Sequence, residues 1–107
     1  MISTNRVILI NFPSNDGSGV DKYRPSLAIK TPDGSYLVFP ITSKYEGKSD
    51  TIKANFYEIL DLKEAGLRMK SWVDTGTPFI TSESSILSLR KIGKLSARDA
   101  NGLSDFI

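Results

Sequence analysis

The sequence predicts a mainly β fold with short helices: a small antiparallel β-barrel or curled sheet that carries a helix at its C-terminal end. Short runs rich in β-branched and aromatic residues alternate with turns containing Gly, Pro, Asn and Asp. The chain has 107 residues, of which 39 % are hydrophobic, enough for one modest core. No internal repeat or linker divides it. We therefore expect residues 1–107 to form a single domain.

The first part of the chain predicts three strands. Arg6–Phe12 is a β-rich run that Pro13 ends, and a loop dense in Gly, Ser, Asn and Asp follows it. Residues 24–42 are typical of a hairpin, because the Pro-Asp-Gly turn at 32–34 separates two apolar runs. Pro25 suits the beginning of a strand, since proline cannot donate a hydrogen bond to the ladder.

Shorter elements are predicted after a polar loop at residues 43–50. Residues 51–60 resemble a further strand, because apolar side chains alternate from 52 to 56. Residues 61–67 predict a single helical turn, which Asp61 can cap at its start and Gly66 can close.

Two short β segments are predicted at 70–73 and 78–80. Residues 82–95 are ambiguous: 82–89 could form a helical turn, while 89–95 suits a strand. The Ser-x-x-Asp spacing of 96–99 indicates the start of a terminal helix, which we expect to run to about Ser104.

Composition excludes several kinds of site. The chain has no cysteine and no histidine, so a disulfide, a zinc-thiolate site and a Ser-His-Asp triad are all excluded. Any hydrolysis must use carboxylates, hydroxyls, arginine or lysine. The net charge of +2 tolerates a polyanion without demanding one. No apolar run is long enough for a membrane span and the start lacks signal-peptide features, so we expect a cytoplasmic protein.

Candidate functional residues gather at one rim of the predicted sheet. Arg24 opens one strand of the hairpin and Thr42 closes its partner, so antiparallel pairing brings them together, with Ser43 beside Thr42. Arginine flanked by hydroxyls suits a phosphate group, and Asp74 could add an acceptor from a third strand end. Each feature alone is more often an ordinary surface residue or turn. Their combination is the signal.

Taken in order, the motifs "VILINFP", "DGSGVDKYRPSLAIK", "YLVFPITSK", "EAGLRMKSWVDT" and "KIGKLSARD" resemble the MazF/PemK family. These proteins are the toxins of type II toxin–antitoxin pairs, and the resemblance covers nearly the whole chain. "RPSLAI" after a Gly-containing loop and "PITS" closing the next strand are its most specific parts.

The resemblance implies an SH3-like β-barrel with added helices, a homodimer, and a metal-independent endoribonuclease without cofactors. Such toxins cut single-stranded RNA, often mRNA, to leave a 2′,3′-cyclic phosphate and a 5′-hydroxyl, and a cognate antitoxin blocks the RNA groove. Arg24, Thr42 and Asp74 match the family's catalytic positions. The family's RNA-binding loop corresponds to Pro13–Tyr23. The implied substrate-binding residues are Ser18, Lys22, Pro25, Ser43, Lys44 and Thr75.

The chain departs from the PemK branch at two positions that bear on proton transfer. That branch has a second arginine where this chain has Trp72, and a histidine in its first loop. Asp74, Asp16, Asp21 and Arg24 itself therefore stay open as proton-transfer groups. Two other functions also stay open: a CcdB-like gyrase poison, which acts by binding alone, and a non-catalytic SH3-like adaptor.

Overall fold

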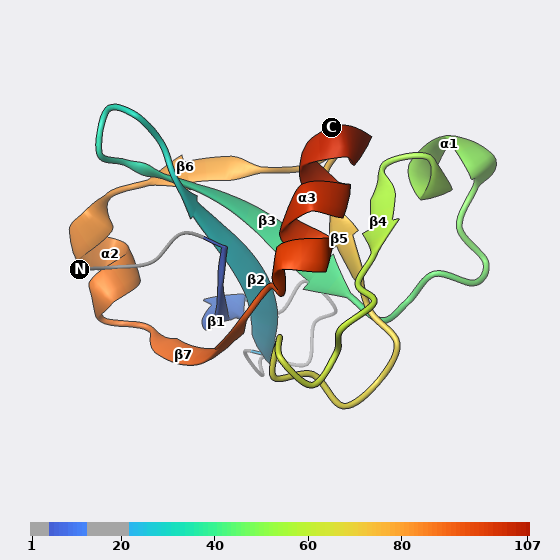
Figure 1. Cartoon of the computed structure of the whole chain (residues 1–107), viewed down its shortest axis with the longest axis horizontal. Helices are drawn as coiled ribbons and strands as arrows, with labels where there is room; N and C mark the ends of the chain where they lie inside the picture. The colour runs from blue at the N-terminus through green and yellow to red at the C-terminus, as the bar shows by residue number, and fades with distance from the viewer. Residues whose placement is uncertain (1–4, 13–21) are drawn as a thin grey trace.

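The computed structural model describes residues 5–12 and 22–107 of the chain. Ten elements follow one another in this part, and Figure 1 shows how they are arranged. In chain order they are β1 (Arg6–Phe12), β2 (Lys22–Lys30), β3 (Tyr36–Thr42), α1 (Asp50–Lys53), β4 (Phe56–Glu58), β5 (Trp72–Asp74), β6 (Phe79–Thr81), α2 (Glu83–Leu87), β7 (Arg90–Lys94) and α3 (Ala97–Phe106).

All strand pairs in the described residues are antiparallel. The strands follow the order β4-β5-β3-β2-β1-β7, and β6 also pairs with β3. The mainly β class and the C-terminal helix are thus confirmed. The hydrogen-bonded path is open, however: among the described residues no pairing joins β7 back to β4, so the sheet does not close into the expected barrel.

One edge of β3 is shared by two short strands. β5 pairs with the end of β3 through Ile41 and Thr42, and β6 pairs with its beginning. The segment 75–78 lies between β5 and β6 and displaces the second strand along β3. The two strands therefore follow one another along the same side of β3, as the two separate β segments that the sequence predicted, and β5 pairs with β4 on its other side.

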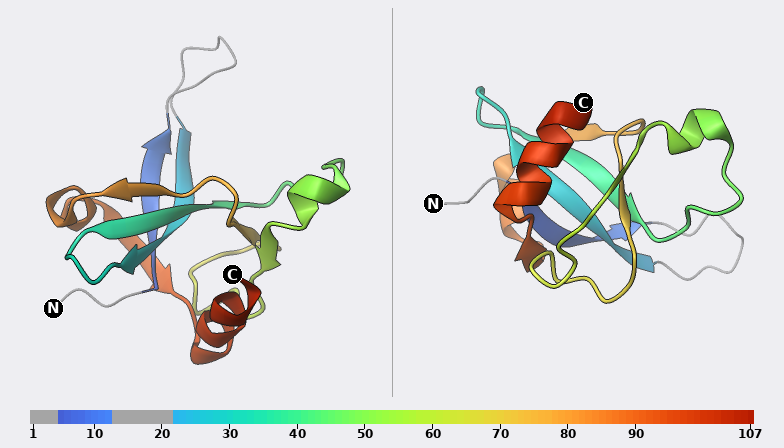
Figure 2. Two further views of the ribbon diagram at one scale, coloured as in Figure 1. Left: turned by 90° about the horizontal axis from the view of Figure 1, so that it is seen from above. Right: turned by 45° about the vertical axis from the view of Figure 1, so that its right-hand side comes forward.

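Alternation along the strands builds two hydrophobic clusters, one on each face of the sheet. One contains Val7, Leu27 and Phe39, and Leu103 of α3 packs into it. The other is smaller and includes the fully buried Ile86 of α2. Figure 2 shows the three helices on different sides of the sheet, which is consistent with this division.

Residues 51–60 correct the sequence prediction of one continuous strand. Residues 50–53 form the short helix α1, and only Phe56–Glu58 is a strand. The side chain of Ser49 accepts a hydrogen bond from the backbone N–H of Ile52 and so caps the helix. Ile52 is 45 % exposed, so the alternation that suggested a strand does not mark a buried face.

The predicted turn at 61–67 is present and closes at Gly66, which has a φ of 76°. The N–H of Leu67 donates to the carbonyl of Leu62 at 2.9 Å, and the N–H of Gly66 donates to that of Lys63 at 3.1 Å. This pair of bonds is the Schellman motif. A Cβ at Gly66 would overlap the carbonyl oxygen of Ile92 in β7, so the turn lies directly against that strand.

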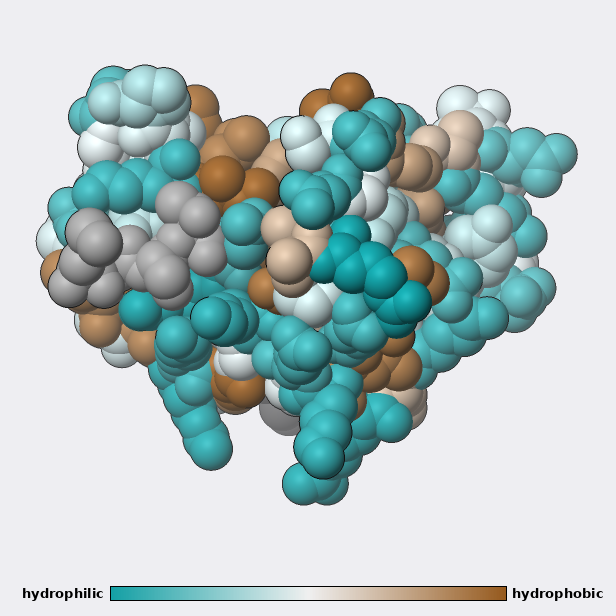
Figure 3. All heavy atoms as spheres, in the orientation of Figure 1, coloured by the Kyte–Doolittle hydropathy of each residue, from teal (hydrophilic) through white to brown (hydrophobic). Residues whose placement is uncertain are grey.

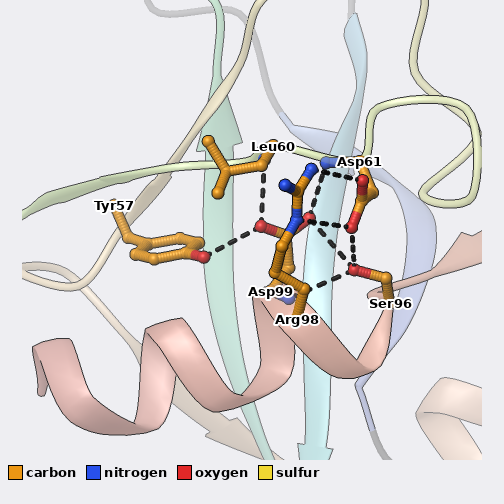
Figure 4. A network of polar contacts seen from close by, with 6 residues as sticks. All are labelled: Tyr57, Leu60, Asp61, Ser96, Arg98 and Asp99. Atoms are coloured by element: carbon orange, nitrogen blue, oxygen red, sulfur yellow. Dashed lines mark hydrogen bonds and ion pairs between the residues drawn. The ribbon is translucent and has the colours of Figure 1, made fainter.

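A buried carboxylate attaches α3 to the rest of the fold (Figure 4). The side chain of Asp99 is fully buried and accepts three short hydrogen bonds, from the Tyr57 hydroxyl at 2.8 Å, Leu60 N–H at 2.9 Å and Asp61 N–H at 2.8 Å. The Ser96 hydroxyl is a fourth, more distant donor at 3.5 Å. The Ser96 hydroxyl accepts from Asp99 N–H at 3.1 Å, which confirms the predicted helix start. The helix ends at Phe106, two residues later than expected.

Asp61 was predicted to cap the turn that follows it, but its carboxylate contacts α3 instead. It accepts from Arg98 Nη2 at 2.6 Å, from Arg98 Nε at 3.2 Å, and from the Ser96 hydroxyl. These hydrogen bonds, chiefly the one from Arg98, lower the pKa of Asp61. Burial, with the hydrogen bond to Asp99, raises the pKa of Tyr57 to about 12.

The face seen in Figure 3 is mostly hydrophilic, with hydrophobic atoms at the C-terminal end of α3 and over β6. Phe106 and Ile107 are 42 % and 69 % exposed. No helix in the part of the chain that the structure describes is both long and apolar enough to cross a membrane.

Candidate functional site

A cleft of about 310 Å³ lies where β2 begins and β3 ends. Three stretches of the chain line it: the start of β2, the end of β3 with the two residues after it, and the coil before β5. The lining residues are Arg24, Pro25, Ile41, Thr42, Ser43, Lys44, Leu67, Arg68, Met69 and Ser71. Arg24, Lys44 and Arg68 are basic, and none of the described residues that line the cleft is acidic.

Strand register brings Arg24 and Thr42 to the same rim. β2 and β3 pair from Lys30–Tyr36 to Ser26–Pro40. Continuing this register by two residues sets Arg24 opposite Thr42, and both side chains line the cleft. The Pro-Asp-Gly turn fixes the register, since the N–H of Gly34 donates to the carbonyl of Thr31 at 3.0 Å and Gly34 has a φ of 89°.

The Thr42 hydroxyl has a defined local partner. Its Oγ1 accepts a hydrogen bond from the backbone N–H of Lys44 at 3.1 Å. Because a hydroxyl has one proton and two lone pairs, this contact leaves the proton of Thr42 for another acceptor. A phosphate oxygen in the cleft is an acceptor of the right kind.

The loop after β3 is held by aromatic stacking. Tyr45 stacks on Trp72 of β5 with ring centroids 4.5 Å apart and planes 15° apart. Lys53 lies over the Tyr45 ring at 4.8 Å and Lys70 lies over the Trp72 ring at 5.7 Å. Trp72 pairs with Thr42 across the two strands. Trp72, which stands where the PemK branch has arginine, therefore packs against the loop that follows Thr42.

The coil before β5 contributes residues that the sequence analysis did not select. Arg68 and Met69 are exposed and come from a later part of the chain than the hairpin residues. They line the same cleft. Met69 is 61 % exposed. Both residues lie within the motif "EAGLRMKSWVDT", but neither was predicted as a site residue; the turn that Gly66 closes was the local signal that the chain reverses just before them.

Asp74 and Thr75 do not line the cleft. The carboxylate of Asp74 accepts from Gly76 N–H at 2.9 Å and from the Thr77 hydroxyl at 2.9 Å, so both its oxygens serve the turn after β5. The Thr75 hydroxyl donates to the carbonyl of Asn55 at 2.7 Å. The structure thus gathers the hairpin residues Arg24, Pro25, Thr42, Ser43 and Lys44 and sets these two residues apart from them.

Two predicted RNA contacts fall outside this description. Ser18 and the acidic loop residues Asp16 and Asp21 lie outside the described residues. Lys22 begins β2, but its side chain is not among the described ones. Within residues 5–12 and 22–107, no cluster of three or more acidic residues could hold a metal ion.

Comparison with known proteins gives one family. The family model described as PemK-like, MazF-like toxin of type II toxin-antitoxin system matches residues 4–105. No curated protein matches the chain.

Proposed function

The chain belongs to the family of PemK-like, MazF-like toxins of type II toxin-antitoxin systems, and from this membership we propose that it is a sequence-specific endoribonuclease. Its substrate is single-stranded RNA, chiefly mRNA, its action needs no metal, and a cognate antitoxin neutralises it. The observation that carries the proposal is the basic cleft that Arg24 and Thr42 both line.

The proposed reaction is attack of a ribose 2′-oxygen on the adjacent phosphorus. The bond from phosphorus to the 2′-oxygen forms, the bond to the 5′-oxygen breaks, and the products are a 2′,3′-cyclic phosphate and a 5′-hydroxyl. The 2′-hydroxyl loses its proton to a base and the departing 5′-oxygen gains one. Between these events the phosphorane carries two negative charges, which fixed donors must stabilise.

Arg24 is the proposed stabiliser of the phosphorane. Its guanidinium is charged at any working pH and presents a planar fork of donors to two phosphate oxygens. Thr42 orients a phosphate oxygen with the proton that its contact to Lys44 leaves free. Ser43 and Lys44 extend the same lining toward the flanking chain. One well-placed donor of this kind contributes on the order of 10²–10³ in rate.

Asp74 is the base that the family resemblance suggests, and the variant Asp74→Asn tests it. A general base contributes about 10²–10⁴ in rate. If Asp74 accepts the 2′-proton, Asp74→Asn loses rate on that scale. If the carboxylate serves only the turn to Gly76 and Thr77, the rate stays within a few-fold of the wild type.

The decisive experiment is incubation of purified protein with a long single-stranded RNA in the presence of EDTA. Arg24→Ala is the test variant. Arg90→Ala is the matched control, because Arg90 is an exposed arginine in β7 that does not line the cleft. We expect discrete fragments ending in a cyclic phosphate from the wild type and from Arg90→Ala only. Intact RNA with the wild type would refute the proposal and favour a protein that acts by binding alone.

A further inference from the structure

We propose that Arg68 and Met69 form a second nucleotide subsite, which binds the phosphate and base of a residue next to the one that is cut. This inference rests on the proposed function, since it takes Arg24 and Thr42 as the site of the scissile phosphate. It assigns a role to two residues that are not among the site residues predicted from the sequence.

The coil that presents these residues is fixed at both ends. On one side the Schellman turn packs Gly66 against the backbone of β7, and Ala65 is fully buried. On the other side the buried Ser71 donates its hydroxyl to the carbonyl of Met69 at 2.9 Å. Arg68 is therefore carried on a short segment of defined backbone. A binding residue held in this way loses less freedom when its ligand arrives.

The number of cations in the cleft exceeds what one phosphate needs. A single arginine satisfies two oxygens of one phosphate group, and Arg24 is assigned that task. Arg68 comes from a different stretch of the chain, and Figure 1 shows this coil, in yellow, near the lower ends of β2 and β3. Arg68 takes part in neither of the two ion pairs between described residues, which are Lys70–Glu58 and Arg98–Asp61.

The volume of the cleft suits a single nucleotide, so the neighbouring nucleotides of a bound strand lie outside it. About 310 Å³ is at the lower end of the range of about 300–1,000 Å³ for small-molecule pockets. A strand whose scissile phosphate contacts Arg24 must continue past the cleft wall, and the coil with Arg68 forms one wall. The next phosphate along the strand is thus the anion for Arg68.

Met69 supplies the apolar part of the subsite. The residue is 61 % exposed although its side chain is unbranched and hydrophobic, and it stands directly after Arg68. A polarizable thioether packs well against aromatic rings, and every base presents such a face. Arg68 and Met69 together therefore match the two parts of a nucleotide, its phosphate and its base.

The test is binding to a mixed-sequence single-stranded deoxyoligonucleotide, measured by fluorescence anisotropy at several salt concentrations. This probe has the phosphates and bases of the substrate but lacks the attacking 2′-hydroxyl, so it cannot be cut by the proposed reaction. The variants are Arg68→Ala and Met69→Ala, and Arg90→Ala is again the matched control. For single strands, each phosphate contact contributes about −0.7 to the slope of log K against log salt.

We expect Arg68→Ala to weaken binding roughly 10-fold at low salt and to reduce the magnitude of the salt slope by about 0.7. Met69→Ala should weaken binding with an unchanged slope, because an apolar contact releases no counterion. Arg90→Ala should match the wild type. If Arg68 had only a structural role, its replacement would not reduce the magnitude of the salt slope by the amount of about 0.7 expected for one phosphate contact.

An unchanged slope in Arg68→Ala, or equal loss in Arg90→Ala, would overturn the subsite. Wild-type protein that shows no salt-dependent binding to the probe would overturn it as well. Failure of the proposed function is a separate result, because it shows as intact RNA in the cleavage assay. A protein that binds the probe through Arg68 yet cuts no RNA keeps the subsite as a binding site and refutes the ribonuclease.

Discussion

Replacing Asp99 by asparagine tests how strongly the buried carboxylate holds α3 and the coil at residues 60–61. Asparagine has the same shape, so no cavity forms. One of its two terminal positions is an amide, which cannot accept the hydrogen bond that Asp61 N–H donates at 2.8 Å. The bonds from Tyr57 and Leu60 remain but lose the charge of their acceptor.

The magnitude follows from these three bonds. An unpaired buried amide costs about 1–3 kcal/mol, and each bond that loses its charge assistance costs about 1 kcal/mol. The neutral side chain is easier to bury, which offsets part of the loss. We expect a net decrease of about 2–4 kcal/mol in the free energy of unfolding, a large share of the roughly 5–15 kcal/mol usual for such domains.

The assay is urea unfolding at pH 7, followed by circular dichroism, with the m-value required to stay constant. Asp105→Asn is the control, since Asp105 is an exposed carboxylate on the same helix and should change stability by less than about 0.5 kcal/mol. A loss below about 1 kcal/mol for Asp99→Asn, or a gain, would refute the reasoning. It would show that desolvation of the carboxylate outweighs its hydrogen bonds.

Three further predictions concern the cleft, the turn beside it and the network. Thr42→Val should lower the rate of single-turnover RNA cleavage roughly 10²-fold, while Thr42→Ser keeps most of the rate, because only the hydroxyl orients the phosphate. Equal cleavage rates for Thr42→Val and Thr42→Ser would contradict this role. Gly66→Ala should cost clearly more urea stability than Gly34→Ala, for which we expect about 1–2 kcal/mol: both have a positive φ, but only Gly66 lies against a backbone carbonyl. Since the pKa of Tyr57 is raised to about 12 from its usual value near 10, the folded state keeps a proton that the unfolded state loses. Stability should therefore fall as pH rises from about 10 to 12, and Tyr57→Phe should show a shallower fall in pH-dependent unfolding.

Local patterns in the sequence were sufficient to predict the hairpin and its rim. A Pro-Asp-Gly turn and two apolar runs determine the register of β2 and β3, and that register, continued two residues beyond Ser26–Pro40, sets Arg24 opposite Thr42. The start of α3 followed from its Ser-x-x-Asp spacing, because capping is a contact between residues three positions apart.

Tertiary contacts account for what the sequence did not predict. Asp99 and Asp61 both match the sequence pattern of a helix cap. Their carboxylates nevertheless accept hydrogen bonds from partners more than 30 positions away in the chain. Arg68 is an exposed arginine that was not predicted as a site residue, and its place in the cleft depends on the fold. The helix at 50–53 is different, since the Ser49 cap and Asp50 in the first turn were visible signals that the apolar alternation outweighed.

The stack of Tyr45 on Trp72 makes the protein its own optical reporter. Trp72 is the single tryptophan of the chain, is 8 % exposed, and pairs with Thr42 in the neighbouring strand. Emission from an indole depends on the polarity and the charges around it, and Lys70 lies over this ring. Because Trp72 pairs with a residue that lines the cleft, we expect a polyanion bound there to change the tryptophan fluorescence of unlabelled protein, which can be followed at equilibrium or in stopped flow.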